Sequence, residues 1–197
     1  RIAVEIDDMR PGEHEPVVMR LVAIAIDQED VAGRELHVLV IGETGRPDRW
    51  QLNGYGRATN PRLTKLEGLI TFRDAVSAWA WTRMSVPVML TRKSELDDNQ
   101  FFPERSLISA FREAGFRTYW LSTQSPLGPY DSSIAVYAAE AHETRYVNPV
   151  DYKKAGVLDG ALLKPFDEIL ARGEKKVFVV LHTLGGHFNY ADRYPDE

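Results

Sequence analysis

The feature that most limits the possible folds is a short apolar run, residues 36–41, which ends abruptly in Gly42 and Glu43. The run is rich in β-branched residues and apolar on both faces, which is typical of a strand covered by helices on each side of a parallel sheet. Such sheets bind ligands at the carboxyl ends of their strands. Glu43 therefore indicates a metal ligand or an acid/base group. The alternative is a solvated carboxylate, or one paired with Arg46 or Arg49.

Further strand and helix patterns alternate along the rest of the chain. Strands are expected at residues 69–76, 116–121 and 176–181, a short edge piece at 145–147, and helices from residue 82 and at 103–115, 131–141 and 160–172. This alternation predicts the α/β fold class, with a doubly wound, mostly parallel sheet and helices on both faces. Residues 1–34 contain prolines, a glycine and a polar turn, and are interpreted as a lead-in or linker.

Composition argues against several classes of function. The 197 residues are 44% hydrophobic with mixed charge, which is ordinary for one globular domain. The formal net charge of −5 leaves no basic footprint, so nucleic acid is not expected as a partner. Without cysteine, disulfides, thiolate catalysis and cysteine-ligated zinc are excluded within this stretch. No apolar run approaches the ~20 residues that cross a bilayer.

Polar groups suited to one reactive site follow several of the expected elements. They are Glu43 after the first strand, Thr82 at a helix start, and His182 and His187 after the last strand. Carboxylate, imidazole and hydroxyl groups are ligands suited to Zn²⁺, which would lower the pKa of the hydroxyl and make it a nucleophile. A helix start also presents N–H groups to an anion such as phosphate.

Each of these residues also has a structural interpretation. A threonine at a helix start is more often an N-cap, worth roughly 1 kcal/mol, and the pattern alone favours that role for Thr82. His182 follows an apolar strand and is interpreted as a hydrogen-bonded core histidine. His187 follows two glycines and is the histidine expected to be available to a ligand. The long loop at residues 45–63 is of a length that is usually functional in compact domains.

Five motifs occur in a fixed order along the chain. They are Val-Ile-Gly-Glu-Thr-Gly-Arg at residues 40–46, Leu-Asn-Gly-Tyr-Gly-Arg at 52–57, Thr-Asn-Pro-Arg-Leu at 59–63, Ser-Val-Pro at 85–87, and His-Thr-Leu-Gly-Gly-His at 182–187 with Arg-Tyr-Pro at 193–195. In this order they resemble the membrane-anchored phosphoethanolamine transferases of the alkaline phosphatase/sulfatase superfamily, which modify bacterial lipopolysaccharide. The resemblance covers residues 35–197.

The resemblance implies a role for four residues. Glu43 and Thr82 would ligate zinc, and Thr82 would be the catalytic nucleophile. Thr82 would take phosphoethanolamine from phosphatidylethanolamine as a phosphothreonine-type covalent intermediate and yield it to lipopolysaccharide, at lipid A or a core sugar. His187 would contact the phosphoryl group or a second zinc, and Asn53 is a substrate-binding candidate in the loop beside the site. The reaction would be two in-line displacements, with zinc and the helix end absorbing oxyanion charge.

The resemblance also implies a domain and a location. Residues 35–197 are expected to be the N-terminal part of a sulfatase-like catalytic domain with an incomplete alkaline phosphatase-like fold, because the Asp-His pair of the family's zinc site does not occur in this sequence. We expect weak zinc affinity and little turnover by this stretch alone. A membrane anchor before residue 1 and a catalytic domain in the periplasm, at the bacterial inner membrane, follow from the same resemblance. The lack of cysteine and the residues at 120–124 favour the core-sugar branch.

Two alternatives compete with this function. The first is a sulfatase or phosphodiesterase of the same superfamily, with Ser85 as nucleophile. Sulfatases resemble Cys/Ser-x-Pro-x-Arg at this place, and Met89 stands at the arginine position, so the sulfate-binding fork is missing. The second alternative is a non-catalytic binding domain that keeps the fold without the chemistry.

Overall fold

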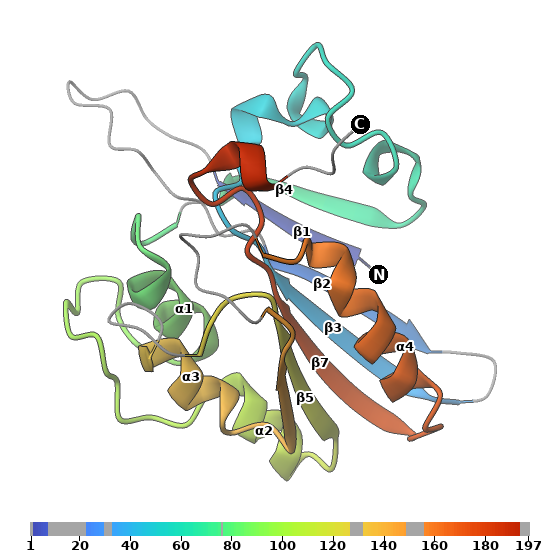
Figure 1. The fold of residues 1–197 in the computed structure, drawn as a ribbon, viewed down its shortest axis with the longest axis vertical. Helices are drawn as coiled ribbons and strands as arrows, with labels where there is room; N and C mark the ends of the chain where they lie inside the picture. Colours follow the sequence, from blue (N-terminus) through green and yellow to red (C-terminus); the bar gives the residue numbers. More distant parts are fainter. Residues whose placement is uncertain are drawn as a thin grey trace.

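The structure, a computed structural model, is built around one seven-stranded sheet (Figure 1). It describes residues 2–7, 23–29, 33–75, 77–126, 132–148 and 156–193. The strand order is β4-β1-β2-β3-β7-β5-β6. In chain order the strands are β1 Ile2–Asp7, β2 Ala23–Glu29, β3 Glu35–Ile41, β4 Leu69–Ala75, β5 Arg117–Ser122, β6 Glu143–Tyr146 and β7 Lys176–His182.

The sheet is mostly parallel, as predicted. The pairs β1–β4, β3–β7, β5–β7 and β5–β6 are parallel, whereas β1–β2 and β2–β3 are antiparallel. In the two central parallel pairs, His182 at the end of β7 is in register with Ile41 of β3 and with Ser122 of β5. The carboxyl ends of β3, β7 and β5 therefore lie level with one another at one edge of the sheet.

Helices cover both faces, which confirms the predicted fold class (Figure 1). The α-helices are α1 Thr82–Leu90, α2 Leu107–Glu113, α3 Ser132–Ala138 and α4 Leu163–Leu170. Phe178 and Val180 of β7 face a core shared with α1, α2 and α3. Val177 and Val179 face the other core, which α4 covers. The continuous apolar character of β7 follows from this burial on both faces.

Sequence patterns predict a lead-in or linker for residues 1–34, whereas the structure places two strands there. That interpretation is wrong for β1 and β2, which lie inside the sheet between β4 and β3. β2 pairs with β3 along its whole length, from Ala23 with Ile41 to Glu29 with Glu35. Short strands of this kind depend on a partner for their stability, and a local pattern does not reveal the partner. The division of the chain into domains stays a prediction.

The helix and edge-strand predictions are confirmed with shifted boundaries. α2 is shorter than residues 103–115 because Ser106 caps it, accepting a hydrogen bond from the backbone N–H of Ile108 at 3.2 Å. Gly115, at φ +86°, stops the helix as expected. The edge piece expected at 145–147 is β6. Of the predicted segments and motifs, residues 76, 131, 194 and 195 lie outside the described residues, as do the prolines and the glycine at 11, 12 and 16.

Short 3₁₀ turns shape the remaining connections. They are η1 Pro47–Arg49, η2 Gln51–Asn53, η3 Leu63–Lys65, η4 Asp159–Leu162 and η5 Tyr190–Arg193. The first three lie in the long loop after β3, η4 leads directly into α4, and η5 follows the loop after β7. Pro165 falls in the first turn of α4, where its missing N–H leaves no helical hydrogen bond unmade, so the helix expected across it forms.

Candidate active site

Glu43 and Thr82, both predicted as site residues, are in direct contact. Glu43 lies just past β3 and is only 5% exposed. Its Oε2 accepts a hydrogen bond from Thr82 Oγ1 at 2.7 Å, and its Oε1 accepts one from Thr44 Oγ1 at 2.9 Å. A buried carboxylate is costly unless donors surround it, and the two hydroxyls are such donors. The sheet thereby unites a strand end and a helix start that are 39 positions apart.

The backbone at Thr44 is strained beside this contact. Thr44 has φ +53°, in the left-handed region that a β-branched residue rarely adopts. Such strain persists only where the surrounding structure over-determines the conformation, and it clusters at functional sites. The strained turn aims the Thr44 hydroxyl at Glu43.

Thr82 is not a helix cap, so the structural interpretation of this residue is wrong. The N-cap of α1 is Trp81, which makes no side-chain capping bond. Thr82 is the first helical residue, and its hydroxyl points to Glu43 instead of the helix backbone. The hydroxyl therefore faces the buried carboxylate, at the end of the helix where N–H groups and the positive end of the dipole favour an anion.

The loop after β7 lies in close contact with the backbone of Glu43. The N–H of Thr183 donates to the carbonyl of Ile41 at 3.0 Å, and the N–H of Gly186 donates to the carbonyl of Glu43 at 3.3 Å. Gly185 has φ +47°, and a Cβ built there would lie 2.8 Å from the carbonyl oxygen of Glu43. Only glycine permits this close approach, which explains one of the two glycines before His187.

His187 is half-buried in the same neighbourhood as Glu43. Burial lowers the pKa of His187, the negative charge of Glu43 opposes that shift, and the positive charge of Arg193 adds to it. An imidazole with a lowered pKa is neutral at pH 7, so it carries one donor nitrogen and one acceptor nitrogen. The structure thus places the predicted substrate-binding histidine on the loop whose backbone bonds that of Glu43.

His182 is a core histidine, as the structural interpretation holds. It is buried, its Nδ1 lies 3.3 Å from Ser122 Oγ, and its ring meets the edge of Trp120 with centroids 5.4 Å apart. Burial lowers the pKa of His182 to about 3, so the ring is neutral at physiological pH. A neutral buried ring in this position supports the strand end.

Asp159 is a structural partner of this loop that the sequence patterns do not reveal. It begins η4, and its carboxylate accepts hydrogen bonds from Thr123 Oγ1 at 2.5 Å and from the N–H groups of Leu184 and Gly185, both at 2.9 Å. In sequence it resembles only an acidic residue before a helix. Its true partners follow β5 and β7, and only the folded chain brings them together.

Two other candidate residues, Asn53 and Ser85, form hydrogen bonds to backbone carbonyl groups of nearby loops. Asn53 Nδ2 donates to the carbonyl of Pro47 at 3.0 Å and so holds the long loop after β3. Its role in substrate binding stays a prediction. Ser85, the nucleophile of the alternative hydrolase function, is buried, and its hydroxyl donates to the carbonyl of Trp79 at 2.6 Å. That bond engages Ser85 with the loop before α1, whereas Thr82 bonds the buried carboxylate.

The donor set fits part of a zinc site. Glu43 and Thr82 supply two oxygen donors at one point, and tetrahedral Zn²⁺ takes four ligands. Among the described residues, no group of three or more His, Cys, Asp or Glu side chains is arranged to hold a metal ion. The residues present thus match half of a tetrahedral set.

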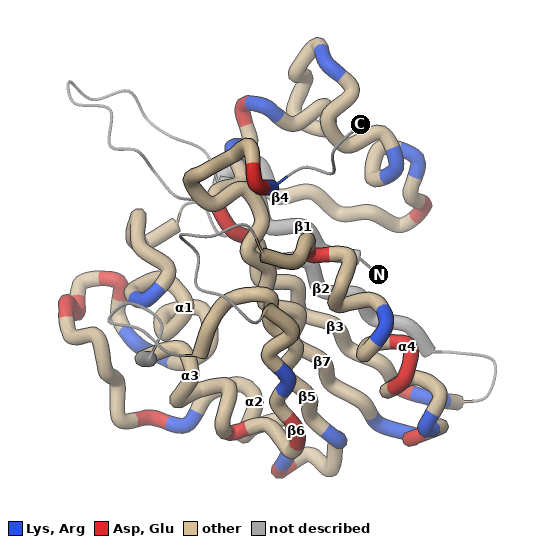
Figure 2. The backbone as a smooth tube through the Cα atoms, in the orientation of Figure 1, with Lys and Arg blue, Asp and Glu red and all other residues tan. Residues whose placement is uncertain are grey.

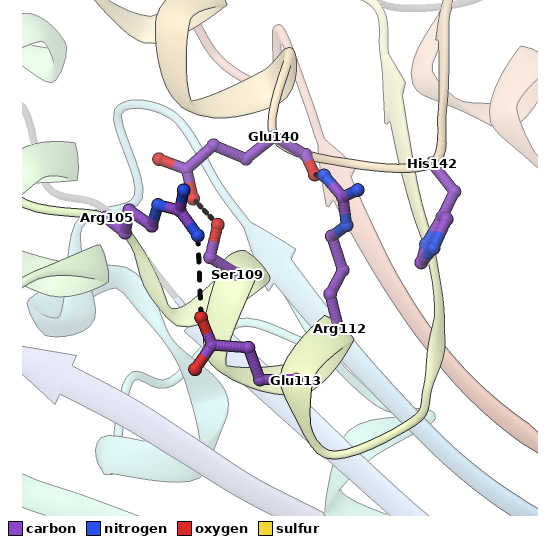
Figure 3. A pocket seen from close by; sticks show the side chains of 6 residues that line it. All are labelled: Arg105, Ser109, Arg112, Glu113, Glu140 and His142. Atoms are coloured by element: carbon purple, nitrogen blue, oxygen red, sulfur yellow. Dashed lines mark hydrogen bonds and ion pairs between the residues drawn. The ribbon is translucent and has the colours of Figure 1, made fainter.

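A separate cavity of about 450 Å³ lies away from this pair, between α2 and the chain that follows α3 (Figure 3). Its polar groups bond one another. Glu140 accepts from Ser109 Oγ at 2.7 Å, Arg105 lies 3.5 Å from Glu113, and Arg112 donates to the carbonyl of Glu140. These bonds tie α2 to the end of α3, and none of the predicted site residues lines the cavity.

The chain is similar to known phosphoethanolamine transferases. A curated relative, phosphoethanolamine transferase EptC of Escherichia coli O18:K1:H7, is 30% identical over 175 residues. That match covers 86% of this chain and 30% of the relative, so the chain spans less than a third of the relative's length.

Two solved structures share the fold. The C-terminal periplasmic domain of EptC from Escherichia coli, in complex with Zn, superposes with a TM-score of 0.74 at 30% identity, over 87% of this chain and 49% of that one. The integral membrane protein lipooligosaccharide phosphoethanolamine transferase A (EptA) from Neisseria meningitidis superposes with a TM-score of 0.69 at 27% identity, over 87% and 32%. The predicted resemblance to phosphoethanolamine transferases and the alkaline phosphatase-like fold class are confirmed. Since the Sulfatase family model matches residues 36–197, the chain belongs to the sulfatase family.

Proposed function

We propose that this chain is part of a zinc-dependent phosphoethanolamine transferase in which Thr82 is the catalytic nucleophile. The observation that carries the proposal is the 2.7 Å hydrogen bond from Thr82 Oγ1 to the buried Glu43 carboxylate. A carboxylate in this position orients the hydroxyl oxygen of Thr82. The carboxylate and the hydroxyl oxygen could then bind the same cation. The chain is similar to proteins named phosphoethanolamine transferases, and this similarity supports phosphoethanolamine as the group that is transferred.

The reaction proceeds by two displacements at phosphorus. In the first, Thr82 Oγ forms a bond to the phosphorus of phosphatidylethanolamine, the bond from phosphorus to the glycerol oxygen breaks, and diacylglycerol leaves with the proton. In the second, the oxygen of a lipopolysaccharide hydroxyl forms a bond to the phosphorus, the bond from phosphorus to Thr82 Oγ breaks, and the hydroxyl proton returns to Thr82. When bound, Zn²⁺ would lower the pKa of the Thr82 hydroxyl and neutralise charge on the phosphoryl oxygens. Glu43 and Thr82 are the residues of this chain that would hold it.

The other groups at the site serve the phosphoryl oxygens. The first turn of α1 would offer N–H groups and the positive end of its dipole to the phosphoryl group on Thr82. His187, neutral because burial lowers its pKa, donates a hydrogen bond to a phosphoryl oxygen. Asn53 lies in the long loop after β3, where we assign it to substrate binding.

We place the reaction on the periplasmic side of the bacterial inner membrane. The support is that the EptC structure is a periplasmic domain and that EptA is an integral membrane protein. The acceptor is lipopolysaccharide, at a core sugar or lipid A, and an anchor outside the described residues would hold the domain at the membrane. In the ranges that the structure describes, no helix has both the length and the apolarity to cross a bilayer.

The test is mass spectrometry of the complete protein after incubation with zinc and phosphatidylethanolamine. We expect phosphoethanolamine on Thr82, and modification of Ser85 instead would favour the hydrolase alternative. Thr82→Ala should lower transfer by roughly 10³-fold or more, while Thr82→Ser, which keeps the hydroxyl, should retain part of it. Thr91→Ala, at the other end of the same helix, is the matched control. Unchanged lipopolysaccharide modification in cells with Thr82→Ala would support a binding domain.

A further inference from the structure

The long loop after β3 is basic in an acidic chain. The whole sequence has 24 Lys and Arg against 29 Asp and Glu. Residues 45–66, which we name the basic loop, run against this balance, and Figure 2 shows basic positions spread along the loops above β4. The charged residues of the basic loop are Arg46, Asp48, Arg49, Arg57, Arg62 and Lys65. Such a concentration of one sign attracts anions to the surface that carries it.

The basic loop forms much of the wall of a cavity of about 410 Å³. Arg46, Arg49 and Trp50 line it from the loop, and Tyr190 lines it from η5. Asp48 orients both arginines: it accepts from Arg46 Nε at 3.1 Å and Arg46 Nη2 at 2.7 Å, and it lies 3.5 Å from Arg49 Nε. Two guanidinium groups share one carboxylate, so the cavity wall keeps a positive charge. Both arginine side chains are more than half exposed, so a ligand can reach them.

Tyr55 helps to hold one of these arginines. Arg49 Nη1 donates to the Tyr55 hydroxyl oxygen at 3.4 Å, and its guanidinium group lies over the Tyr55 ring, 5.3 Å from the centroid. Asp48 and Tyr55 therefore together orient Arg49.

The cavity lies beside the reacting pair. Thr44, which lines it, donates to Glu43 Oε1 at 2.9 Å, and Glu43 Oε2 accepts from Thr82. Tyr190, which also lines the cavity, follows the loop that carries His187. The side chains of Thr44 and Glu43 would thus lie between a ligand in the cavity and the Thr82 nucleophile.

We propose that this cavity is the acceptor subsite and binds an anionic sugar of the acceptor glycolipid. The phosphate or carboxylate of the sugar lies against Arg46 and Arg49, since the planar guanidinium fork matches both groups. The apolar face of the ring packs on Trp50 and Tyr190, which offer flat surfaces with few rotatable bonds. A volume of this size suits a saccharide unit. The inference rests on the proposed function, which requires an acceptor hydroxyl to approach phosphothreonine at Thr82.

Titration of zinc-free protein with small probes, followed by tryptophan fluorescence and NMR, tests the subsite. The probes are glucosamine 6-phosphate, glucosamine, inorganic phosphate and glycerophosphoethanolamine. We expect glucosamine 6-phosphate to bind at least tenfold more tightly than each of the others. Arg46→Gln with Arg49→Gln should weaken that binding at least tenfold. Arg62→Gln with Lys65→Gln, which removes equal charge from the same loop outside the cavity, should change it less than twofold.

Other outcomes overturn the proposal. If both double variants lost the same affinity for glucosamine 6-phosphate, the loop would attract the anion through long-range charge alone, without a binding site. Equal affinity for inorganic phosphate would mean an anion site without sugar recognition, and equal affinity for glycerophosphoethanolamine would assign the cavity to the donor. Should the arginine variant fail to fold, Tyr190→Leu, at a side chain that is 55% exposed, must weaken sugar phosphate binding without weakening phosphate binding. Because no step needs zinc or turnover, an unmodified Thr82 would refute the proposed function and leave this binding result intact.

Discussion

Asp159 positions the loop that carries His187. Its carboxylate bonds two successive N–H groups of that loop, at Leu184 and Gly185, and also the hydroxyl of Thr123 after β5. Charge-assisted hydrogen bonds of this kind are about twice as strong as neutral ones. The side chain therefore holds the ends of two parallel strands in the arrangement that the site requires.

Asp159→Asn should loosen this arrangement while it preserves the size of the side chain. One carboxylate oxygen becomes an NH₂ group that faces a donor, so at least one bond is lost. We expect the free energy of unfolding to fall by about 1–3 kcal/mol and transfer to fall mainly in kcat. Urea unfolding and steady-state kinetics measure the two effects. Asp167→Asn, at an exposed position of α4, is the control, and equal losses in both variants would contradict a positioning role.

His182 should make stability depend on pH. Burial lowers the pKa of His182 to about 3 in the folded chain, against the ordinary value of 6.5 in the unfolded chain. The unfolded state therefore binds a proton first, so this contribution to stability is complete above pH 6.5 and is lost as the pH falls toward 3. The slope for one such group is about 1.4 kcal/mol per pH unit.

His182→Asn removes this titration but keeps a polar atom near Ser122. Urea unfolding of both proteins between pH 4 and 7.5 should show a shallower acid slope for the variant. The difference between the two proteins isolates His182 from the other histidines. Parallel slopes would mean that His182 is not the group whose protonation opposes folding.

At the scale of elements, the fit between the turn after β3 and the loop after β7 decides the position of Glu43. The loop bonds the backbone of Ile41 and Glu43, and it approaches so closely at Gly185 that no side chain fits. Backbone contacts of this kind leave the carboxylate little freedom, which is the preorganisation that electrostatic catalysis requires.

Gly185→Ala tests that fit, and the chain supplies a matched control. Gly173 also has a positive φ, at +69°, but a Cβ there would meet nothing within 4 Å. Gly173→Ala should cost only the backbone penalty of about 1–2 kcal/mol. Gly185→Ala should cost roughly 1–3 kcal/mol more, because its Cβ meets the carbonyl of Glu43, and it should also lower transfer. Thermal unfolding and transfer activity are measured for both variants. If Gly185→Ala and Gly173→Ala lost the same stability and kept the same activity, the loop after β7 would have shifted without moving Glu43.

At the scale of the whole molecule, the reactive edge is separate from an ion-pair network around β6. Glu143 accepts from Arg172 Nη1 at 2.7 Å and from Arg145 Nε at 2.6 Å, and Arg145 also reaches Glu168. Arg172 is the main cause that lowers the pKa of Glu143 to about 2. The network joins the edge strand β6 to the end of α4. Glu143 is the first residue of β6, so it lies at the opposite end of the strand from the carboxyl ends that carry the site.

Glu143→Gln should therefore destabilise the fold without changing the site. The contribution of an ionised Glu143 is complete above pH 4.5 and is lost as the pH falls toward 2, because its pKa is depressed in the folded chain. Since the side chain is 28% exposed, solvent screening limits the expected loss at pH 7 to about 1 kcal/mol. Urea unfolding at pH 7 and pH 3 measures it, with Glu113→Gln in an exposed pair as control. A fall in transfer by the variant would contradict the separation.

Much of the fold could be predicted from local patterns. The apolar segments at 36–41 and 176–181 are strands whose residues pack into the cores on both faces of the sheet, and Gly115 ends a helix because it adopts a positive φ. The strands β1 and β2 could not be predicted in the same way. Their place in the sheet depends on pairing with β3 and β4, and the sequence around them reads as a linker.

The sequence by itself determined the type of the main elements after residue 34, the apolar character of the central strands and the presence of Glu43, Thr82 and His187 near element ends, because periodicity and turn chemistry act over a few residues. Only the tertiary structure decided what these residues contact. It turned Thr82 from a helix cap into the partner of Glu43, and it brought Asp159 to the loop after β7. Such contacts join residues tens of positions apart. They form because parallel strands align their carboxyl ends, a consequence of chain topology that no local pattern carries.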